Sequence, residues 1–257
     1  MNKLKFLIVL IIGLSICSCS TDDNNSSEDN PDENNQTLQK LVNFSSTNVN
    51  SDDIQNVTKL IYDNDNLIKI EEAFVGIGEN IWNYNYSDNN QLIAVNDIPI
   101  SFIDGNLSIE YTYEREEYYT KNNKVIELTT YFKDEPDQAF QFNYKTLYTY
   151  SNENITEIKF FDPDDNITGF NTYQYDNMNN VLRGLKDINR WIFPISILHI
   201  ASDNNIINRK EFDGEGNLLI EFQYGYEYDN NGFPTIRQTT ILENGTSNTK
   251  TTFFNYE

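Results

Sequence analysis

The chain has 257 residues, 14% of them aromatic, and its 18 Lys and Arg stand against 40 Asp and Glu, which makes the formal net charge −22. This balance argues against nucleic acid as a partner, because such binding depends on clustered Lys and Arg that neutralise phosphates. Both cysteines, Cys17 and Cys19, lie near the amino terminus, so the rest of the chain offers no thiol as a nucleophile, disulfide partner or metal ligand.

The first 18 residues have the pattern of an export signal. Lys3 and Lys5 precede an apolar run from Phe6 to Leu14. That run is too short to cross a bilayer as a helix, which takes about twenty residues. Basic residues followed by a short apolar core are typical of a signal peptide, so we predict one over residues 1–18.

Cys19 is the expected lipidation site. The segment before it resembles a lipobox, with Ile16 at the third position before the cysteine and Ser18 directly before it. Cys17 is the weaker alternative, because Ile16 would then stand where a small residue is required. An ordinary secretory signal is a second alternative, although no A-x-A-like cleavage site lies nearby. Acylation of Cys19 would supply more than one lipid chain, which is enough for stable membrane attachment.

Residues 19–40 are predicted to form a disordered acidic tether behind the lipidated cysteine. They are almost wholly Asn, Asp, Ser, Glu and Thr, and such a segment buries too little apolar surface to offset its ordering entropy. Its opening, Ser20-Thr21-Asp22-Asp23, resembles the acidic surface-export signal of Bacteroidota lipoproteins. A merely solvated linker is the alternative. We therefore expect an exported protein that is lipid-anchored to the outer membrane and lies at the cell surface.

Residues 41–257 are expected to form a single β domain. Polar turns of Asp, Asn and Gly recur between aromatic runs, and these residues tolerate the positive φ angles of tight hairpins. The runs alternate with period two, as in Phe222, Tyr224, Tyr226 and Tyr228, so each strand has one buried and one wet face. The prediction is an all-β fold, an antiparallel meander of hairpins that forms a curved sheet or a soluble barrel with aromatic residues inside. The same alternation is present in Trp82, Tyr84 and Tyr86, in Tyr111 and Tyr113, and in Phe140, Phe142 and Tyr144.

One segment, near residues 185–200, departs from the β pattern. It is the most apolar stretch beyond the signal, and its first apolar residues, from Leu185 on, follow helical spacing. Pro194 would kink or end a helix there. We predict a short helix or apolar loop that closes one end of the β core, with a partner-docking or ligand-lining loop as the alternative.

The turn motifs carry a resemblance to known families. The unit from Tyr226 to Gly232 is similar to a degenerate YD repeat of the Rhs class. The order of elements more closely resembles an uncharacterised Bacteroidota lipoprotein family, a domain of unknown function with a porin-like fold. The shared features are the lipobox, the acidic tether, the Tyr-Asp-Asn hairpins, an apolar insertion after one of them, and the closing hairpin that ends at Thr235. The resemblance implies a fold and an envelope location, and no catalytic residues.

A porin-like shape need not mean a pore. A barrel in a membrane turns apolar residues outward to lipid. Here the polar faces of the predicted strands carry charges, such as Glu157 with Lys159, which would be costly against acyl chains. A soluble barrel or a strongly curved sheet is therefore the preferred form.

No catalytic residue, metal ligand or cofactor site is predicted. His199 is the only histidine and has apolar neighbours, so it is interpreted as a core or rim residue. The acidic turn from Asp162 to Asn166 offers oxygen ligands for calcium, but Ile167 stands where an EF-hand loop requires Gly, and a solvated turn is the better interpretation. Ligand-binding residues are not identifiable from the sequence.

The primary hypothesis is a non-enzymatic cell-envelope lipoprotein whose β domain presents loops for binding or assembly. Its partners would be the membrane, through the lipid anchor, and a glycan or an envelope protein. One alternative is a surface glycan-binding accessory lipoprotein, which exposed Trp82 and Trp191 in a shared groove would favour. The other is a carboxylate-dependent hydrolase, which two facing carboxylates with raised pKa values would favour.

Overall fold

The structure is a computed structural model. It describes residues 39–257 except 48, 90, 104–105, 123, 184 and 186–201. The predicted signal peptide, most of the tether and both cysteines fall outside the described residues. All the strands belong to one compact unit, Thr37–Glu257. No helix among the described residues has the length and apolar character that a membrane span requires.

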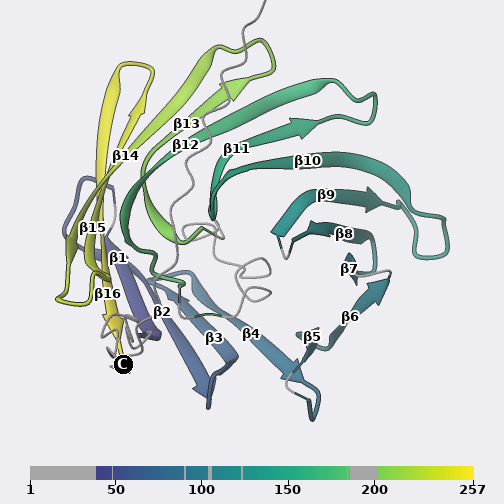
Figure 1. Ribbon diagram of the computed structural model, residues 1–257, viewed down its shortest axis with the longest axis horizontal. Coiled ribbons are helices and arrows are strands. Elements are labelled where there is room, and N and C mark those ends of the chain that lie inside the picture. Colours follow the sequence, from purple (N-terminus) through teal and green to yellow (C-terminus); the bar gives the residue numbers. More distant parts are fainter. Residues whose placement is uncertain are drawn as a thin grey trace, which may run out of the picture. The chain divides into compact units, whose positions relative to one another are not determined.

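The described residues form a closed barrel of sixteen antiparallel strands that follow one another in chain order (Figure 1). β1 pairs with β16, so the sheet closes on itself. The predicted antiparallel meander is confirmed, and it forms a barrel and not an open sheet. The strands are β1 (Leu41–Thr47), β2 (Ile54–Asp63), β3 (Asn66–Phe74), β4 (Gly78–Tyr86), β5 (Leu92–Val95), β6 (Ile98–Ile103), β7 (Asn106–Glu110), β8 (Glu114–Lys121), β9 (Lys124–Phe132), β10 (Gln141–Ser151), β11 (Asn154–Phe161), β12 (Ile167–Asn179), β13 (Asn204–Asp213), β14 (Leu218–Tyr228), β15 (Pro234–Glu243) and β16 (Thr246–Tyr256).

The hairpin turns use Asn and Asp as the sequence predicts. Asn64 and Asn152 have φ angles of 53° and 54° in the turns that follow β2 and β10. In the turn between β14 and β15, one carboxylate oxygen of Asp229 accepts hydrogen bonds from the backbone N–H groups of Asn231 and Phe233, both at 2.9 Å. The side chain thus satisfies donors that have no strand partner, which is why Asp recurs in these turns.

The aromatic face of most strands lies inside the barrel. Tyr84 is buried and Trp82 and Tyr86 pack against the core, as their alternation predicts. Two aromatic runs differ from the prediction. Tyr111 and Tyr113 lie in the connection between β7 and β8, where they are 38% and 46% exposed.

The other exception is the run from Phe140 to Tyr144. A register shift occurs in β10 between Phe142 and Tyr144. Phe142 pairs with Tyr131, and Tyr144 pairs with Thr130, so the two aromatic residues of β10 occupy opposite faces. The prediction of one common face for these residues is therefore wrong.

The outward face carries charged pairs together with exposed isoleucines, such as Ile61 opposite Lys69 and Ile81 opposite Glu71. In the pairing of β2 with β3, Lys59 lies opposite Glu71, whose carboxylate is 2.6 Å from Lys69 Nζ. On β11, Lys159 pairs with Glu157 at 2.8 Å. These side chains alternate with the buried ones and therefore point outward. Charged pairs on this surface would be costly against acyl chains.

Six tyrosines tie neighbouring strands together at one end of the barrel. Each lies towards the end of an even-numbered strand, and its phenol donates to a backbone carbonyl within the first three residues of the preceding odd-numbered strand, at 2.6 to 2.8 Å. The ring thereby stays in the core while its hydroxyl donates a hydrogen bond to a backbone carbonyl at a strand end. The pairs are Tyr62 to Leu41, Tyr86 to Leu67, Tyr150 to Val125, Tyr175 to Ile155, Tyr226 to Ile206 and Tyr256 to Pro234.

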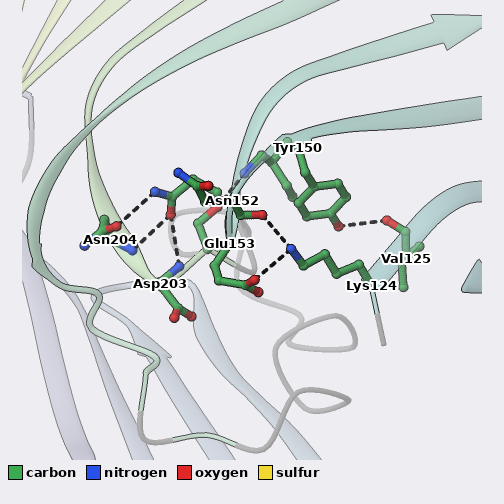
Figure 2. Close-up of polar contacts among 10 residues, drawn as sticks. Lys124, Val125, Tyr150, Asn152, Glu153, Asp203 and Asn204 are labelled. Carbon is green, nitrogen blue, oxygen red and sulfur yellow. Dashed lines mark hydrogen bonds and ion pairs between the residues drawn. The ribbon is translucent and has the colours of Figure 1, made fainter. Parts of the chain in front are cut away.

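Figure 2 shows one of these contacts, where the Tyr150 phenol reaches the Val125 carbonyl. Next to it, Lys124 Nζ lies 5.3 Å from the centre of the Tyr150 ring. The same ammonium group donates to the Asn152 carbonyl at 2.5 Å and pairs with Glu153 at 3.0 Å (Figure 2). Lys40 repeats this arrangement on Tyr62 and the turn after β2. The starts of β1 and β9 are thus fixed to the turns after β2 and β10.

Removal of a single phenol should weaken the barrel measurably. We expect Tyr62→Phe and Tyr150→Phe each to lower the free energy of unfolding by about 1 to 3 kcal/mol, because each leaves a carbonyl without its donor. Tyr113→Phe, at an exposed turn, should change it by less than about 0.5 kcal/mol. Urea unfolding followed by circular dichroism measures all three. Equal effects of the three substitutions would contradict a role for the hydroxyl groups.

The charged outer face predicts the behaviour of the barrel in solution. Residues 37–257, expressed without the preceding segment, should remain monodisperse in buffer without detergent. Size-exclusion chromatography with light scattering measures this. A requirement for detergent would show that the outer face contacts lipid.

Candidate functional site

Three described residues that follow β12 pack into the barrel core. Val181, Leu182 and Leu185 are all buried and belong to the same core cluster as residues of β1 to β9 and β16. Asn180 and Asn205 hold this segment, because they donate to the backbone carbonyls of Asn204 and Asn179 at 3.0 and 2.8 Å. Leu185, the one described residue of the predicted apolar loop, therefore packs into the core.

The rest of that loop, residues 186–201, lies outside the described residues, and Trp191 and His199 lie there with it. Trp82, the other tryptophan, packs against the core inside the barrel. This position matches the interpretation of the aromatic stripe as core and does not match an exposed platform.

A first group of inward-facing polar residues lies on β15, β16, β1, β2 and β3. Thr58 and Asn56 are buried, and Asn56 Nδ2 donates to Glu72 Oε1 at 3.3 Å. Arg237 lies opposite Thr252, and Lys250 lies opposite Thr239, so both cations share this inner face. We call these residues the basic wall. Burial lowers the pKa of Lys250, and Arg237 lowers it further, while burial raises the pKa of Glu72.

A second inward-facing group lies on β8, β9 and β10 and the turn before β8. We call it the Tyr/Glu cluster. Glu116 lies opposite Ile109 on one side and Thr130 on the other, and both of these residues are buried. Its carboxylate accepts a hydrogen bond from the Tyr118 phenol at 2.8 Å. The members of the cluster are Tyr111, Glu114, Glu116, Tyr118, Thr130, Tyr144 and Tyr148.

Electrostatic interactions connect the members of the Tyr/Glu cluster. Burial raises the pKa of Glu116, the Tyr118 hydrogen bond lowers it, and the charge of Glu114 raises it again. Burial, followed by the charges of Glu116 and Glu114, raises the pKa of Tyr111 to about 12. Tyr144 and Tyr148 also feel the charge of Glu116, and burial is the main cause of their raised pKa values. The charge of Glu116 therefore raises the pKa values of four phenols.

The described residues contain no group of three or more His, Cys, Asp or Glu side chains that could hold a metal ion. In the acidic turn considered for calcium, Asp162 accepts hydrogen bonds from the backbone N–H groups of Asp164 and Asn166. Asp165 pairs with Lys145 at 2.5 Å. These contacts fit a solvated turn held by its own side chains.

Two surface hollows lie at hairpin tips. One has a volume of about 370 Å³ and is lined by Leu218, Leu219 and Leu242 among others. The other, of about 310 Å³, is lined by the turn after β1 and by Thr249 to Thr251 of β16. Neither contains residues of the Tyr/Glu cluster.

The comparisons with known proteins identify similar folds only. No family model matches the chain, and no curated protein matches it. A porin-like protein from Bacteroides uniformis is 13% identical with a TM-score of 0.44, and the match covers 84% of this chain and 96% of that one. A porin-like protein from Bacteroides vulgatus is 10% identical with a TM-score of 0.37, and the match covers 86% and 99%. Likenesses at this level say nothing about what the chain binds.

The packing of the residues that follow β12 can be tested by truncating one of them. Leu182 is 1% exposed, so Leu182→Ala should lower the free energy of unfolding by about 2 to 5 kcal/mol. Leu218→Ala, at a half-exposed position on the outside, should change it by less than about 0.5 kcal/mol. Chemical denaturation compares the two variants. A small effect of Leu182→Ala would mean that the segment is not part of the core.

Proposed function

We propose that this protein is an exported, lipid-anchored envelope protein whose barrel binds a ligand or partner without catalysing a reaction. The observation that carries the proposal is the distribution of side chains over the two faces of the closed sheet. Charged pairs such as Lys159 with Glu157 face outward, and aromatic and polar residues face inward. A barrel of this kind is suited to water around it and to a ligand within it.

A lipid anchor would connect such a barrel to the membrane. The lipobox before Cys19 supports this attachment, and the acidic tether that follows supports a position away from the bilayer surface. The resemblance of the opening of the tether to a surface-export signal supports an outward orientation. We therefore place the barrel at the outer face of the outer membrane in this proposal.

The chemistry of the inward groups supports binding over catalysis. The phenols around Glu116 have raised pKa values and are neutral at physiological pH, so they act as hydrogen-bond donors and ring surfaces and not as bases. Glu72, the other inward carboxylate with a raised pKa, lies on β3, and its hydrogen-bond partner is the Asn56 amide. A hydrolase would instead need two carboxylates arranged on either side of one substrate bond.

Glycan binding is the second candidate function, and one observation favours it. Among the described residues, five of the six aromatic side chains with large exposure gather at the turn before β8, the end of β9 and the start of β10. Exposed aromatic patches mark interaction sites on protein surfaces. The five are Tyr111, Tyr113, Phe132, Phe142 and Tyr144.

The anchor is tested by two matched cysteine variants. In the native bacterium, Cys19→Ala should prevent acylation and release the protein from the membrane fraction. Cys17→Ala should leave it membrane-bound, because the lipobox residues Ile16 and Ser18 are retained. Fractionation and labelling with a fatty-acid analogue measure both. Full membrane attachment of Cys19→Ala would disprove the anchor at this residue.

A further inference from the structure

The Tyr/Glu cluster holds two carboxylates that have no described cationic partner. Glu114 and Glu116 alternate along β8 with Arg115 and Glu117 and therefore occupy the opposite face. Arg115 Nε pairs with Glu117 at 3.0 Å on the outward side. Among the described residues, no Lys or Arg forms an ion pair with Glu114 or Glu116. A half-buried carboxylate pair of this kind is stabilised by a positive ligand.

Tyrosine side chains share the inner face with these carboxylates. Tyr118 is buried and donates to Glu116, whereas Tyr111 and Tyr144 are more than a third exposed and form the accessible side of the cluster. The face of a tyrosine ring carries partial negative charge and attracts a cation that lies over it. The rings and carboxylates therefore favour the same charge of ligand.

The Thr130 hydroxyl is a third feature of the cluster. Thr130 is completely buried, lies opposite Glu116 on β8 and Tyr144 on β10, and its hydroxyl reaches the Tyr144 phenol, whose pKa this side-chain hydrogen bond lowers. A buried hydroxyl is costly unless another polar group reaches it. Thr130 therefore links the Tyr144 phenol to the inner face that carries Glu116.

We propose that the Tyr/Glu cluster binds a small organic cation of the quaternary ammonium type. This ligand class rests on the binding role proposed for the barrel. Aromatic rings supply attraction without hydrogen bonds, which suits a quaternary ammonium group, and the carboxylates balance its charge. The net charge of −22 attracts cations towards the barrel over a longer range. The described residues offer no group of three His, Cys, Asp or Glu side chains here that could hold a metal ion.

The direct test compares choline with dimethylbutanol, its uncharged carbon isostere. Isothermal titration calorimetry of the full-length protein in a non-ionic detergent measures both. We expect choline to bind at least about tenfold more tightly than dimethylbutanol, because the two differ only in charge. Equal affinity would overturn the proposal, since the rings would then recognise apolar shape alone. Absence of choline binding, or tighter binding of calcium or magnesium at the same site, would overturn it as well.

Two matched pairs of variants locate the site. Glu116→Gln should weaken choline binding by about tenfold or more, and Glu117→Gln, one residue along β8 and on the outward side, should change it by less than about twofold. Tyr144→Phe should retain most of the affinity because it keeps the ring, whereas Tyr144→Ala should lose about fivefold. Equal losses in Glu116→Gln and Glu117→Gln would place the ligand elsewhere and overturn the proposal.

Unfolding midpoints of the four variants show whether a variant has lost only the binding site or has also lost its fold. The comparison of choline with dimethylbutanol uses the unmodified protein and needs no variant. If choline does not bind, the proposed ligand class is wrong, and the expected membrane fractionation of Cys19→Ala is unaffected. If the unmodified protein is released from the membrane, the proposed anchor is wrong, and the expected calorimetry result is unaffected. The two proposals therefore fail in distinguishable ways.

Discussion

Pairing of the first strand with the last is the constraint on which the rest of this structure depends. Leu41 lies opposite Tyr256 and Phe44 lies opposite Phe254, although more than two hundred residues separate each pair along the chain. Without this contact β1 and β16 would be open edges, ready to pair with other chains. With it, every strand has two partners, and the sheet acquires an inside and an outside. Closure over so long a loop carries a high entropic cost before it gains any contact, so we infer that it forms late in folding.

Because the barrel is closed, the side chains that alternate along each strand lie alternately in the core and on the outer surface. Tyrosine suits this division because its ring fills the interior while its hydroxyl reaches a carbonyl at a strand end. Tyr62, Tyr150 and Tyr256 all do so, on different strands, with the same geometry. The repeated Tyr residues and Asn turns therefore have a structural role and not a catalytic one. Its regularity explains why the motif is so prominent in a chain that lacks any recognisable active-site motif.

The interior is not uniform. Leu182 and its described neighbours after β12 are part of the core. Elsewhere the inner face is charged, with Arg237, Lys250 and Glu72 on the basic wall and Glu114 and Glu116 in the Tyr/Glu cluster. Charged groups are costly inside a protein unless they are paired or reach water or a ligand. Their presence on the inner face is the strongest sign that the barrel binds something there.

The sequence by itself determined the local features of this protein: β strands, Asn and Asp turns, and the alternation of aromatic with polar residues, because each depends on residues close together in the chain. Tertiary structure decided the rest. Alternation alone placed Phe142 and Tyr144 on one face, and a register shift against β9 separated them. Tyr226, and not Tyr228 beside the turn, reaches a backbone carbonyl on β13, since the choice depends on the neighbouring strand. Closure of the barrel and assembly of the Tyr/Glu cluster arise from cross-strand register, which no local pattern specifies.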